Sequence, residues 1–120
     1  MKKILIVDDE PNIVMTLEYT FKKSNYEVFI ARDGQEALDI LKTNFPDVII
    51  LDIMMPMVDG FATLEQIRKD DNLQHTKVMF LSAKNKESDI EKGLALGADA
   101  YMTKPFSIKK VVEKVEDLLE

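Results

Sequence analysis

The sequence predicts an α/β protein built on a doubly wound, five-stranded parallel sheet with helices on both faces. Short apolar runs alternate five times with segments that carry helical spacing. The long apolar runs do not alternate with polar residues, which is typical of parallel strands buried on both faces. Five successive strand-then-helix units favour a parallel sheet, because each crossover returns the chain to the same end of the sheet.

The individual elements follow in order from the apolar residues. The predicted strands lie at residues 4–7, 28–31, 48–51, 78–81 and 100–102. Each strand is followed by apolar residues that share one face of a helix: Ile13, Leu17 and Phe21; Ala37, Leu38 and Leu41; Phe61, Leu64 and Ile67; Ile90 and Leu94; and Ile108, Val111, Val112, Val115 and Leu119. Asp59 and Ser107 suit the N-caps of the third and fifth helices, and Gly97 suits the end of the fourth. We expect the strand order 2-1-3-4-5, the flavodoxin-like arrangement.

Composition excludes several classes of function. The chain has 120 residues, which suits one domain over residues 1–120, and no cysteine, so disulfides, cysteine-ligated metals and cysteine nucleophiles are ruled out. A net charge of −6 argues against non-specific binding to nucleic acid, which needs a basic surface. The longest apolar run, Val48–Leu51, is too short to span a bilayer, and no charged-then-apolar leader opens the chain. We therefore expect a cytoplasmic protein that binds neither membranes nor nucleic acid directly.

Acidic residues follow the first and third predicted strands. Asp8, Asp9 and Glu10 come directly after the first strand, and Asp52 ends the third. These two strands are neighbours in the expected order, about 4.8 Å apart, and ligands bind at their carboxyl ends. Carboxylates this close repel one another unless a cation is present, and oxygen ligands favour Mg²⁺. The alternative is that Asp8 or Asp9 caps the first helix, which leaves Asp52 unexplained.

A hydroxyl and a lysine follow the two remaining strands on that side. Ser82 ends the fourth strand, where its hydroxyl could hydrogen-bond a phosphoryl oxygen. Lys104 follows the fifth strand and is long enough to bridge the roughly 9–10 Å to the third. Taken singly, Ser82 reads as a turn residue and Lys104 as a solvated charge. Their position beside the acids indicates one shared site at this edge of the sheet.

Four segments that contain these residues resemble the receiver domain of response regulators, the phosphoacceptor module of two-component signalling. The similarity covers essentially all of residues 1–120. The segments stand in order at the ends of the predicted strands: ILIVDDE (4–10), DIMMPMVDG (52–60), LSAK (81–84) and GADAYMTKPF (97–106). Each segment alone is moderately specific, and the four in this order are highly specific.

The resemblance implies roles for the acidic residues and their neighbours. Asp52 would accept the phosphoryl group. Asp8, Asp9, Asp52 and the backbone carbonyl of Met54 would hold Mg²⁺, for which Mn²⁺ can substitute. The side chains two positions after Asp52 and Ser82, here Met54 and Lys84, would flank the water that removes the phosphoryl group.

The resemblance also implies how the site would respond to phosphorylation. Ser82 and Lys104 would bind the phosphoryl oxygens, and the Lys104–Pro105 peptide bond is expected to be cis. Tyr101 would be the switch aromatic, which turns inward when Ser82 moves toward the phosphate.

A signalling function follows from this resemblance. The domain would accept a phosphoryl group from a sensor histidine kinase, a histidine-phosphotransfer protein or a small phosphodonor, and act on a downstream protein or effector domain. Phosphoryl transfer needs positioning and charge neutralisation, which Mg²⁺ and Lys104 would supply. The product, an acyl phosphate, is labile, so the signal resets by hydrolysis. Such a domain has no dedicated substrate but catalyses its own phosphorylation and dephosphorylation. We expect a monomer before phosphorylation.

Three alternatives stand beside this reading. A phosphatase of the haloacid-dehalogenase type would place its nucleophile after the first strand with a second acid two residues on, and no clear Asp-x-Asp is present there. A flavin-binding carrier would need a Ser/Thr/Gly-rich phosphate loop after that strand, whereas this loop is acidic. A degenerate receiver would only bind partners, and the retained site residues argue against it.

The output face expected of receivers comprises the fourth helix, the fifth strand and the fifth helix. Receivers attached to winged-helix DNA-binding domains usually dimerise there through opposite charges, and Asp99 and Lys114 stand at matching places. Ile90 and Ala100 replace two of the usual charges and form an apolar patch with Tyr101. We therefore expect a mostly monomeric phosphorylated domain that uses this face for another protein. The alternative is that Ile90 belongs to the buried side of its helix.

Overall fold

Strands and helices alternate along the chain in the computed structural model, which describes residues 1–120. The strands are β1 (Lys3–Val7), β2 (Glu27–Ala31), β3 (Val48–Leu51), β4 (Lys77–Ser82) and β5 (Ala100–Thr103). The helices are α1 (Pro11–Lys23), α2 (Gly34–Ile40), α3 (Gly60–Lys69), α4 (Glu87–Ala95) and α5 (Ile108–Leu119), with a short 3₁₀ helix η1 (Asp71–Leu73) before β4. The five predicted strands are confirmed, each bound lying within one residue of its expected position. None of the helices is long and apolar enough to cross a bilayer.

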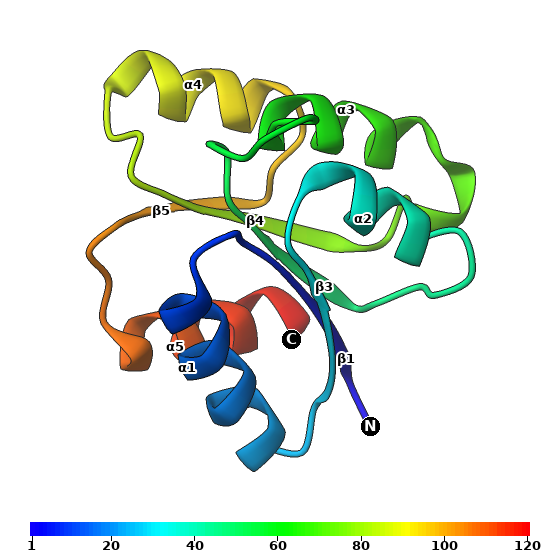
Figure 1. Cartoon of the computed structure of the whole chain (residues 1–120), viewed down its shortest axis with the longest axis vertical. Helices are drawn as coiled ribbons and strands as arrows, with labels where there is room; N and C mark the ends of the chain where they lie inside the picture. Colours follow the sequence, from blue (N-terminus) through cyan, green and yellow to red (C-terminus); the bar gives the residue numbers. More distant parts are fainter.

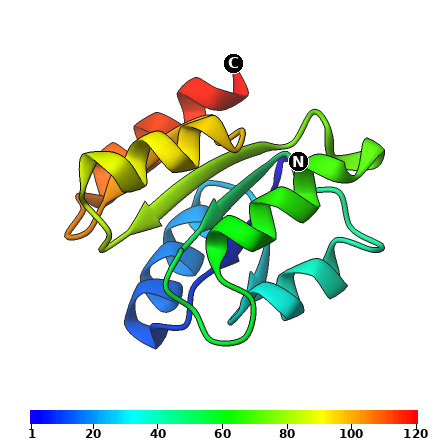
Figure 2. The same cartoon turned by 90° about the horizontal axis from the view of Figure 1, so that it is seen from above.

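The five strands form one parallel sheet in the order β2-β1-β3-β4-β5, which confirms the predicted topology. Helices α2, α3 and α4 cover one face of the sheet, and α1 and α5 cover the other (Figure 1). Seen from above, α2 and α3 lie side by side on their face (Figure 2). The winding direction reverses between β1 and β3, so the carboxyl ends of these two strands flank the expected binding position.

A hydrophobic core lies on each side of the sheet. In β1, Leu5 and Val7 face the side of α2 and α3, whereas Ile4 and Ile6 face the side of α1 and α5. All four side chains are at most 1% exposed. Burial on both faces explains why the strand sequences do not alternate. Each such side chain contributes roughly 1.5–3 kcal/mol by leaving water.

The predicted helix ends are confirmed in three places. The carboxylate of Asp59 accepts a hydrogen bond from the backbone N–H of Ala62 at 2.8 Å, at the start of α3. The hydroxyl of Ser107 accepts one from Lys110 N–H at 3.4 Å, at the start of α5. Gly97 follows α4 with φ of 108°, a conformation that favours glycine.

The start of α1 shows whether Asp8 or Asp9 caps this helix. Glu10 is the N-cap residue, and no side chain makes a capping hydrogen bond there. The carboxylate of Asp8 accepts from the backbone N–H of Glu10 at 2.9 Å, before the helix begins. The interpretation of Asp8 or Asp9 as a helix cap is therefore wrong.

Helix α4 differs from its prediction. Leu94 was expected on the buried face with Ile90, but it is 47% exposed, and Ile90 is half-buried. The residue of α4 that is buried is Gly93. A Cβ at this position would lie 3.0 Å from the ring of Phe80 and 3.1 Å from that of Tyr101, so the helix approaches the sheet along its glycine. Leu94 consequently lies outside the contact.

Candidate functional site

The ends of β1 and β3 position two buried carboxylates. The backbone N–H of Asp8 donates to the carbonyl of Ala31 at 3.1 Å, and that of Asp52 donates to Val7 at 2.9 Å, so both residues continue the ladder of the sheet. Both residues are only 3% exposed. Parallel pairing thus brings together acids that are far apart in sequence.

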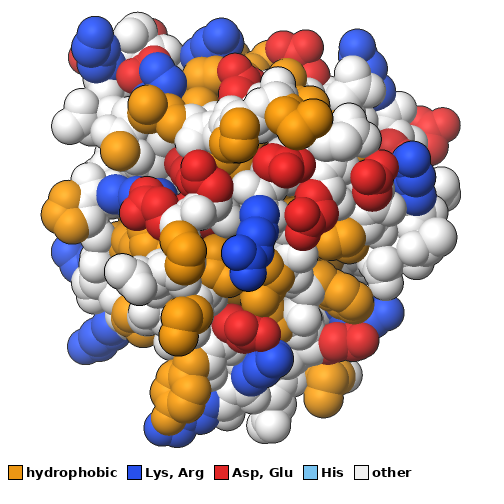
Figure 3. Space-filling model, viewed as in Figure 1, with side chains coloured by type: hydrophobic (Ala, Val, Ile, Leu, Met, Phe, Trp, Pro, Cys, Tyr) orange, Lys and Arg blue, Asp and Glu red, His pale blue; other side chains and the backbone are white.

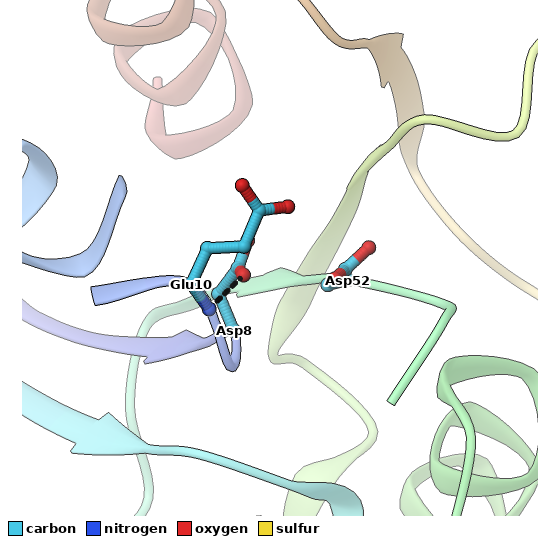
Figure 4. Close-up of side chains that lie close together, drawn as sticks. All are labelled: Asp8, Glu10 and Asp52. Atoms are coloured by element: carbon cyan, nitrogen blue, oxygen red, sulfur yellow. Dashed lines mark hydrogen bonds between the residues drawn. The ribbon is translucent and has the colours of Figure 1, made fainter. Parts of the chain in front are cut away.

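A third carboxylate, that of Glu10, completes an acidic cluster. One oxygen each from Asp8, Glu10 and Asp52 lies within 4.8 Å of the others. Asp8 and Glu10 come from the turn after β1, and Asp52 from the end of β3 (Figure 4). On the molecular surface, acidic side chains gather across the middle of the face seen in Figure 3. Carboxylates in this number are the hard oxygen ligands that Mg²⁺ prefers.

Lys104 places its ammonium group among these acids. Its Nζ atom lies 2.9 Å from Glu10 Oε1, 3.0 Å from Asp8 Oδ2 and 3.6 Å from Asp52 Oδ2. The lysine side chain is only 10% exposed. Its backbone N–H donates to the carbonyl of Ser82 at 2.8 Å, which fixes the start of the loop after β5. The following Lys104–Pro105 peptide bond is cis.

The cluster carries an excess of negative charge, because three carboxylates surround one ammonium group. Burial raises the pKa of Asp8 above its usual range. Burial also raises the pKa of Asp52, and the charge of Asp8 raises it further. Burial lowers the pKa of Lys104, but its hydrogen bonds to Glu10 and Asp8 outweigh this, so the pKa of Lys104 is raised overall. One ammonium therefore does not neutralise the site, and a further cation would relieve it.

The loop after β3 leaves one oxygen of Asp52 free of hydrogen bonds. Asp52 Oδ1 accepts from the backbone N–H of Ile53 at 2.8 Å, whereas Oδ2 faces Lys104 at 3.6 Å. Gly60 closes this loop by donating to the carbonyl of Ile53 at 2.9 Å. A Cβ on Gly60 would lie 2.2 Å from the backbone oxygen of Asp52, so only glycine allows this approach. Met54, two residues after Asp52, is 59% exposed.

Ser82 and Tyr101 lie together behind this edge of the sheet. Ser82 is fully buried, and its hydroxyl accepts from the backbone N–H of Lys84 at 3.2 Å. The hydroxyl of Tyr101 donates to the carbonyl of the same Lys84 at 2.7 Å. Its half-buried ring lies 5.7 Å from that of Phe80, at a tilt of 52°. Tyr101 is thus already turned toward the protein, linked through Lys84 to Ser82.

The structure brings together most of the predicted site residues but not all of them. Asp8, Asp52 and Lys104 meet, whereas Asp9 is exposed and lies outside the cluster of three carboxylates. Glu10, which the sequence analysis named among the acids after the first strand but to which it gave no role, is in the cluster. The signal that could have identified it is the period of two in extended chain, which directs alternate side chains to the same side. Asp8 and Glu10 are alternate residues, and Glu10 still has extended backbone.

The predicted output face is only partly as expected. Lys114 is exposed and Ala100 is half-buried. The carboxylate of Asp99, however, forms an ion pair with Arg68 at 3.0 Å and accepts from the backbone N–H of Val78 at 2.8 Å. Asp99 therefore has an internal partner. Its side chain is 30% exposed, and its carboxylate is already bonded to two groups of the same chain.

Comparisons in sequence give a consistent match. The family model described as the response regulator receiver domain matches residues 4–116. The alkaline phosphatase synthesis transcriptional regulatory protein PhoP of Bacillus subtilis (strain 168) is 46% identical over 118 residues, which cover 98% of this chain and 48% of that protein. The chain thus spans about half the length of this curated relative.

Comparisons in structure lead to the same group of proteins. The receiver domain of the Francisella response regulator 1452 superposes with a TM-score of 0.91 and 37% identity, over 99% of this chain and 97% of that one. The chemotaxis response regulator CheY4 of Vibrio cholerae gives a TM-score of 0.93 and 31% identity, over 99% of both chains. The fold of this chain thus has close counterparts among solved response regulator structures.

Proposed function

The chain belongs to the response regulator receiver domain family, and on this premise we propose that it is a signalling switch phosphorylated on Asp52. The observation that carries the choice of residue is the position of its carboxylate. Asp52 Oδ1 is held by a backbone N–H, and Oδ2 is free to attack. Asp52 also ends β3, beside β1 and β4 in the middle of the sheet.

The proposed reaction needs little covalent chemistry from the protein. Asp52 Oδ2 attacks the phosphorus of the donor, and the bond from phosphorus to the donor's leaving atom breaks, with its electron pair leaving on that atom. The product is an acyl phosphate on Asp52. Lys104, whose ammonium lies 3.6 Å from Asp52 Oδ2, can offset charge on the phosphoryl oxygens, and Ser82 can donate a hydrogen bond to them. Attack of water on phosphorus then restores the carboxylate and releases phosphate.

A divalent cation is part of the proposal because the donor set fits it. The clustered oxygens of Asp8 and Asp52 are hard ligands with an uncompensated negative charge. We propose Asp8, Asp9, Asp52 and the backbone carbonyl of Met54 as the residues that hold Mg²⁺ or Mn²⁺. The bound cation would supply charge neutralisation for the incoming phosphoryl group.

The partners follow from the family. As a receiver domain, the chain is expected to receive its phosphoryl group from a sensor histidine kinase or a histidine-phosphotransfer protein, with a small phosphodonor as a substitute. An open groove beside Lys104 is lined by Ile13, Ala83, Pro105 and Phe106 as well as Glu10, and offers a donor protein an apolar approach to the site. We also propose that the protein is cytoplasmic and that residues 1–120 form one domain.

The output is proposed to pass through the face formed by α4, β5 and α5. The half-buried ring of Tyr101 and the exposed side chain of Leu94 lie on this face, and both are apolar surfaces for a downstream protein or effector domain. The relative from Bacillus is named a transcriptional regulatory protein, so we extend an output in transcription to this chain. With a net charge of −6, the domain itself is not proposed to contact nucleic acid.

Incubation with acetyl phosphate and Mg²⁺, followed by intact mass measurement, tests the function. We expect the mass of the wild-type protein to rise by one phosphoryl unit, and Asp52→Asn to show no increase. A protein that remains unmodified while still binding Mg²⁺ would favour a receiver that only binds partners. Full labelling of Asp52→Asn would show that another residue is the acceptor.

A further inference from the structure

The ammonium group of Lys104 lies off-centre among its three carboxylates. Its distances to Glu10 Oε1 and Asp8 Oδ2, 2.9 Å and 3.0 Å, are those of strong ion pairs. Its distance to Asp52 Oδ2, 3.6 Å, is too long for a hydrogen bond. Lys104 is therefore held on the side of the turn after β1, and not against the carboxylate that the proposed function modifies.

The carboxylate of Glu10 has one hydrogen-bonding partner, Lys104. The helix cap at α1 is made by the backbone of Glu10, whose carbonyl accepts from the N–H groups of Ile13 and Val14, both at 3.1 Å. Its side chain makes no capping bond. The hydrogen bond that this side chain does make is the one accepted from Lys104 Nζ.

The exposure of the two carboxylates that hold Lys104 differs greatly. The side chain of Asp8 is 4% exposed, so its pair with Lys104 is costly to break. That of Glu10 is 57% exposed, and water can replace Lys104 there at a modest cost. The ion pair with Glu10 therefore favours one position of the Lys104 ammonium, but it can be broken at a modest cost in free energy.

We propose that Glu10 is a positioning residue that restrains Lys104 on the Asp8 side of the cluster and competes for its ammonium with a phosphoryl group on Asp52. This inference rests on the proposed function. When the ammonium of Lys104 binds phosphoryl oxygens, it has to leave Glu10 or divide its hydrogen bonds between Glu10 and the phosphoryl group. The restraint consequently lowers the affinity of the site for the phosphoryl group and for stable mimics of it.

The test uses beryllofluoride, a mimic of the phosphoryl group, titrated into the 120-residue protein at saturating Mg²⁺. Two variants separate contact from charge. Glu10→Gln removes the ion pair and the charge, whereas Glu10→Asp keeps the charge but shortens the side chain by one methylene, so that it no longer reaches Lys104. Both should bind beryllofluoride about two- to fivefold more tightly than wild type, the range of an exposed ion pair.

A matched control comes from helix α1, which follows Glu10. Glu18 pairs with Lys22 at 2.7 Å on the exposed side of α1, away from the cluster. Glu18→Gln makes the same change of charge and loses a comparable ion pair, and should leave the beryllofluoride affinity unchanged. Separate titration of Mg²⁺ into each variant ensures that the metal is saturating in every measurement.

A spectroscopic signature accompanies the affinities. In protein with ¹⁵N-labelled lysine, the Nζ signal of Lys104 should shift in both Glu10 variants before beryllofluoride is added, and not in Glu18→Gln. The proposal is overturned if neither Glu10 variant binds more tightly, or if Glu10→Asp behaves like wild type while Glu10→Gln is tighter, which would show a general effect of charge. If wild type itself fails to bind beryllofluoride, the proposed function fails together with this inference.

Discussion

The two ends of the sheet hold their charges in different ways. At the amino end, Arg68 donates to the carbonyls of Gly97 and Thr76, at 3.0 Å and 2.9 Å, and to the carboxylate of Asp99 at 3.0 Å. Asp99 in turn accepts from the backbone N–H of Val78 at 2.8 Å. One cation faces one anion, and all three guanidinium nitrogens of Arg68 donate hydrogen bonds.

At the carboxyl end, one cation faces three anions. Lys104 lies within 3.6 Å of Asp8, Glu10 and Asp52, and the pKa values of both Asp8 and Asp52 are raised, chiefly by burial. Lys104 also links the loop after β5 to the turn after β1, but its single charge leaves the acids of the cluster in excess. The difference teaches that a balanced, hydrogen-bonded ion pair indicates structure, whereas an excess of buried carboxylates indicates chemistry.

Removing the cation at the carboxyl end should give the largest effect. Lys104→Ala leaves no positive side chain beside the phosphoryl oxygens, and transfer from acetyl phosphate to Asp52 should fall by roughly 100-fold or more. Mg²⁺ affinity should stay similar or become slightly tighter, because a competing cation is lost. Lys109→Ala, an exposed lysine at the start of α5, serves as the control. A tenfold loss of Mg²⁺ affinity in Lys104→Ala would contradict this role.

Removing the cation at the amino end should affect stability and not chemistry. Arg68→Ala breaks three hydrogen bonds and leaves Asp99 half-paired, so the free energy of unfolding should fall by roughly 2–3 kcal/mol. The rate of phosphorylation should change less than twofold. Urea unfolding of Arg68→Ala beside Lys69→Ala, its exposed neighbour, measures the first quantity. Loss of phosphorylation in a folded Arg68→Ala protein would contradict the view that the amino end of the sheet serves stability alone.

Removing an anion at the carboxyl end should stabilise the protein in the absence of Mg²⁺. A carboxyl whose pKa is raised on folding stabilises the fold below its unfolded pKa, about 3.9, and this contribution is lost as the pH rises through the folded pKa. Asp52→Asn should therefore raise the free energy of unfolding at pH 7 by about 1 kcal/mol or more. It should also flatten the fall in stability as the pH rises from acid to neutral.

Urea unfolding of wild type and Asp52→Asn over this range of pH checks the prediction. The matched variant at the amino end is Asp99→Asn, which loses a balanced ion pair and should be destabilised at pH 7. An Asp52→Asn protein that is less stable than wild type at pH 7 would show that Asp52 is held by favourable interactions, as Asp99 is.

The smallest predicted effect concerns the lifetime of the acyl phosphate. Met54, two residues after Asp52, is exposed and its thioether cannot orient water, so Met54→Asn should speed hydrolysis by a few-fold at most. Loss of the phosphoryl group can be followed by intact mass after the donor is removed. Met57→Asn, in the same loop and 84% exposed, is the control. Equal rates of hydrolysis in Met54→Asn and wild type would show that the side chain at position 54 does not influence this reaction.

The positions of the strands and their burial pattern were predictable from sequence because they depend on local regularities. Runs such as Val48–Leu51 reveal strands buried on both faces, and the caps Asp59 and Ser107 mark helix starts through one short-range hydrogen bond each. The exposure of Leu94 was not predictable in this way. It depends on how closely Gly93 approaches two aromatic rings that lie elsewhere in the chain.

The candidate site was predictable as a set of strand ends but not as a set of contacts. Topology alone brings Asp8, Asp52 and Lys104 together, because the carboxyl ends of parallel strands share one edge. That Glu10, and not Asp9, meets Lys104 depends on which way two adjacent side chains point after β1. The internal partner of Asp99 was likewise invisible, because Arg68 reaches it from 31 positions away in the chain.

Locating the phosphoryl group tests the central claim most directly. Wild-type protein phosphorylated by acetyl phosphate with Mg²⁺ is treated with borohydride, which reduces an aspartyl phosphate to homoserine, and the peptides are sequenced by mass spectrometry. We predict homoserine at position 52 alone. Reduction at Asp8 or Asp9, or at Glu10 to the longer alcohol, would show that the excess of carboxylates does not single out Asp52. A phosphoryl group on His75, the one histidine, would contradict the account altogether.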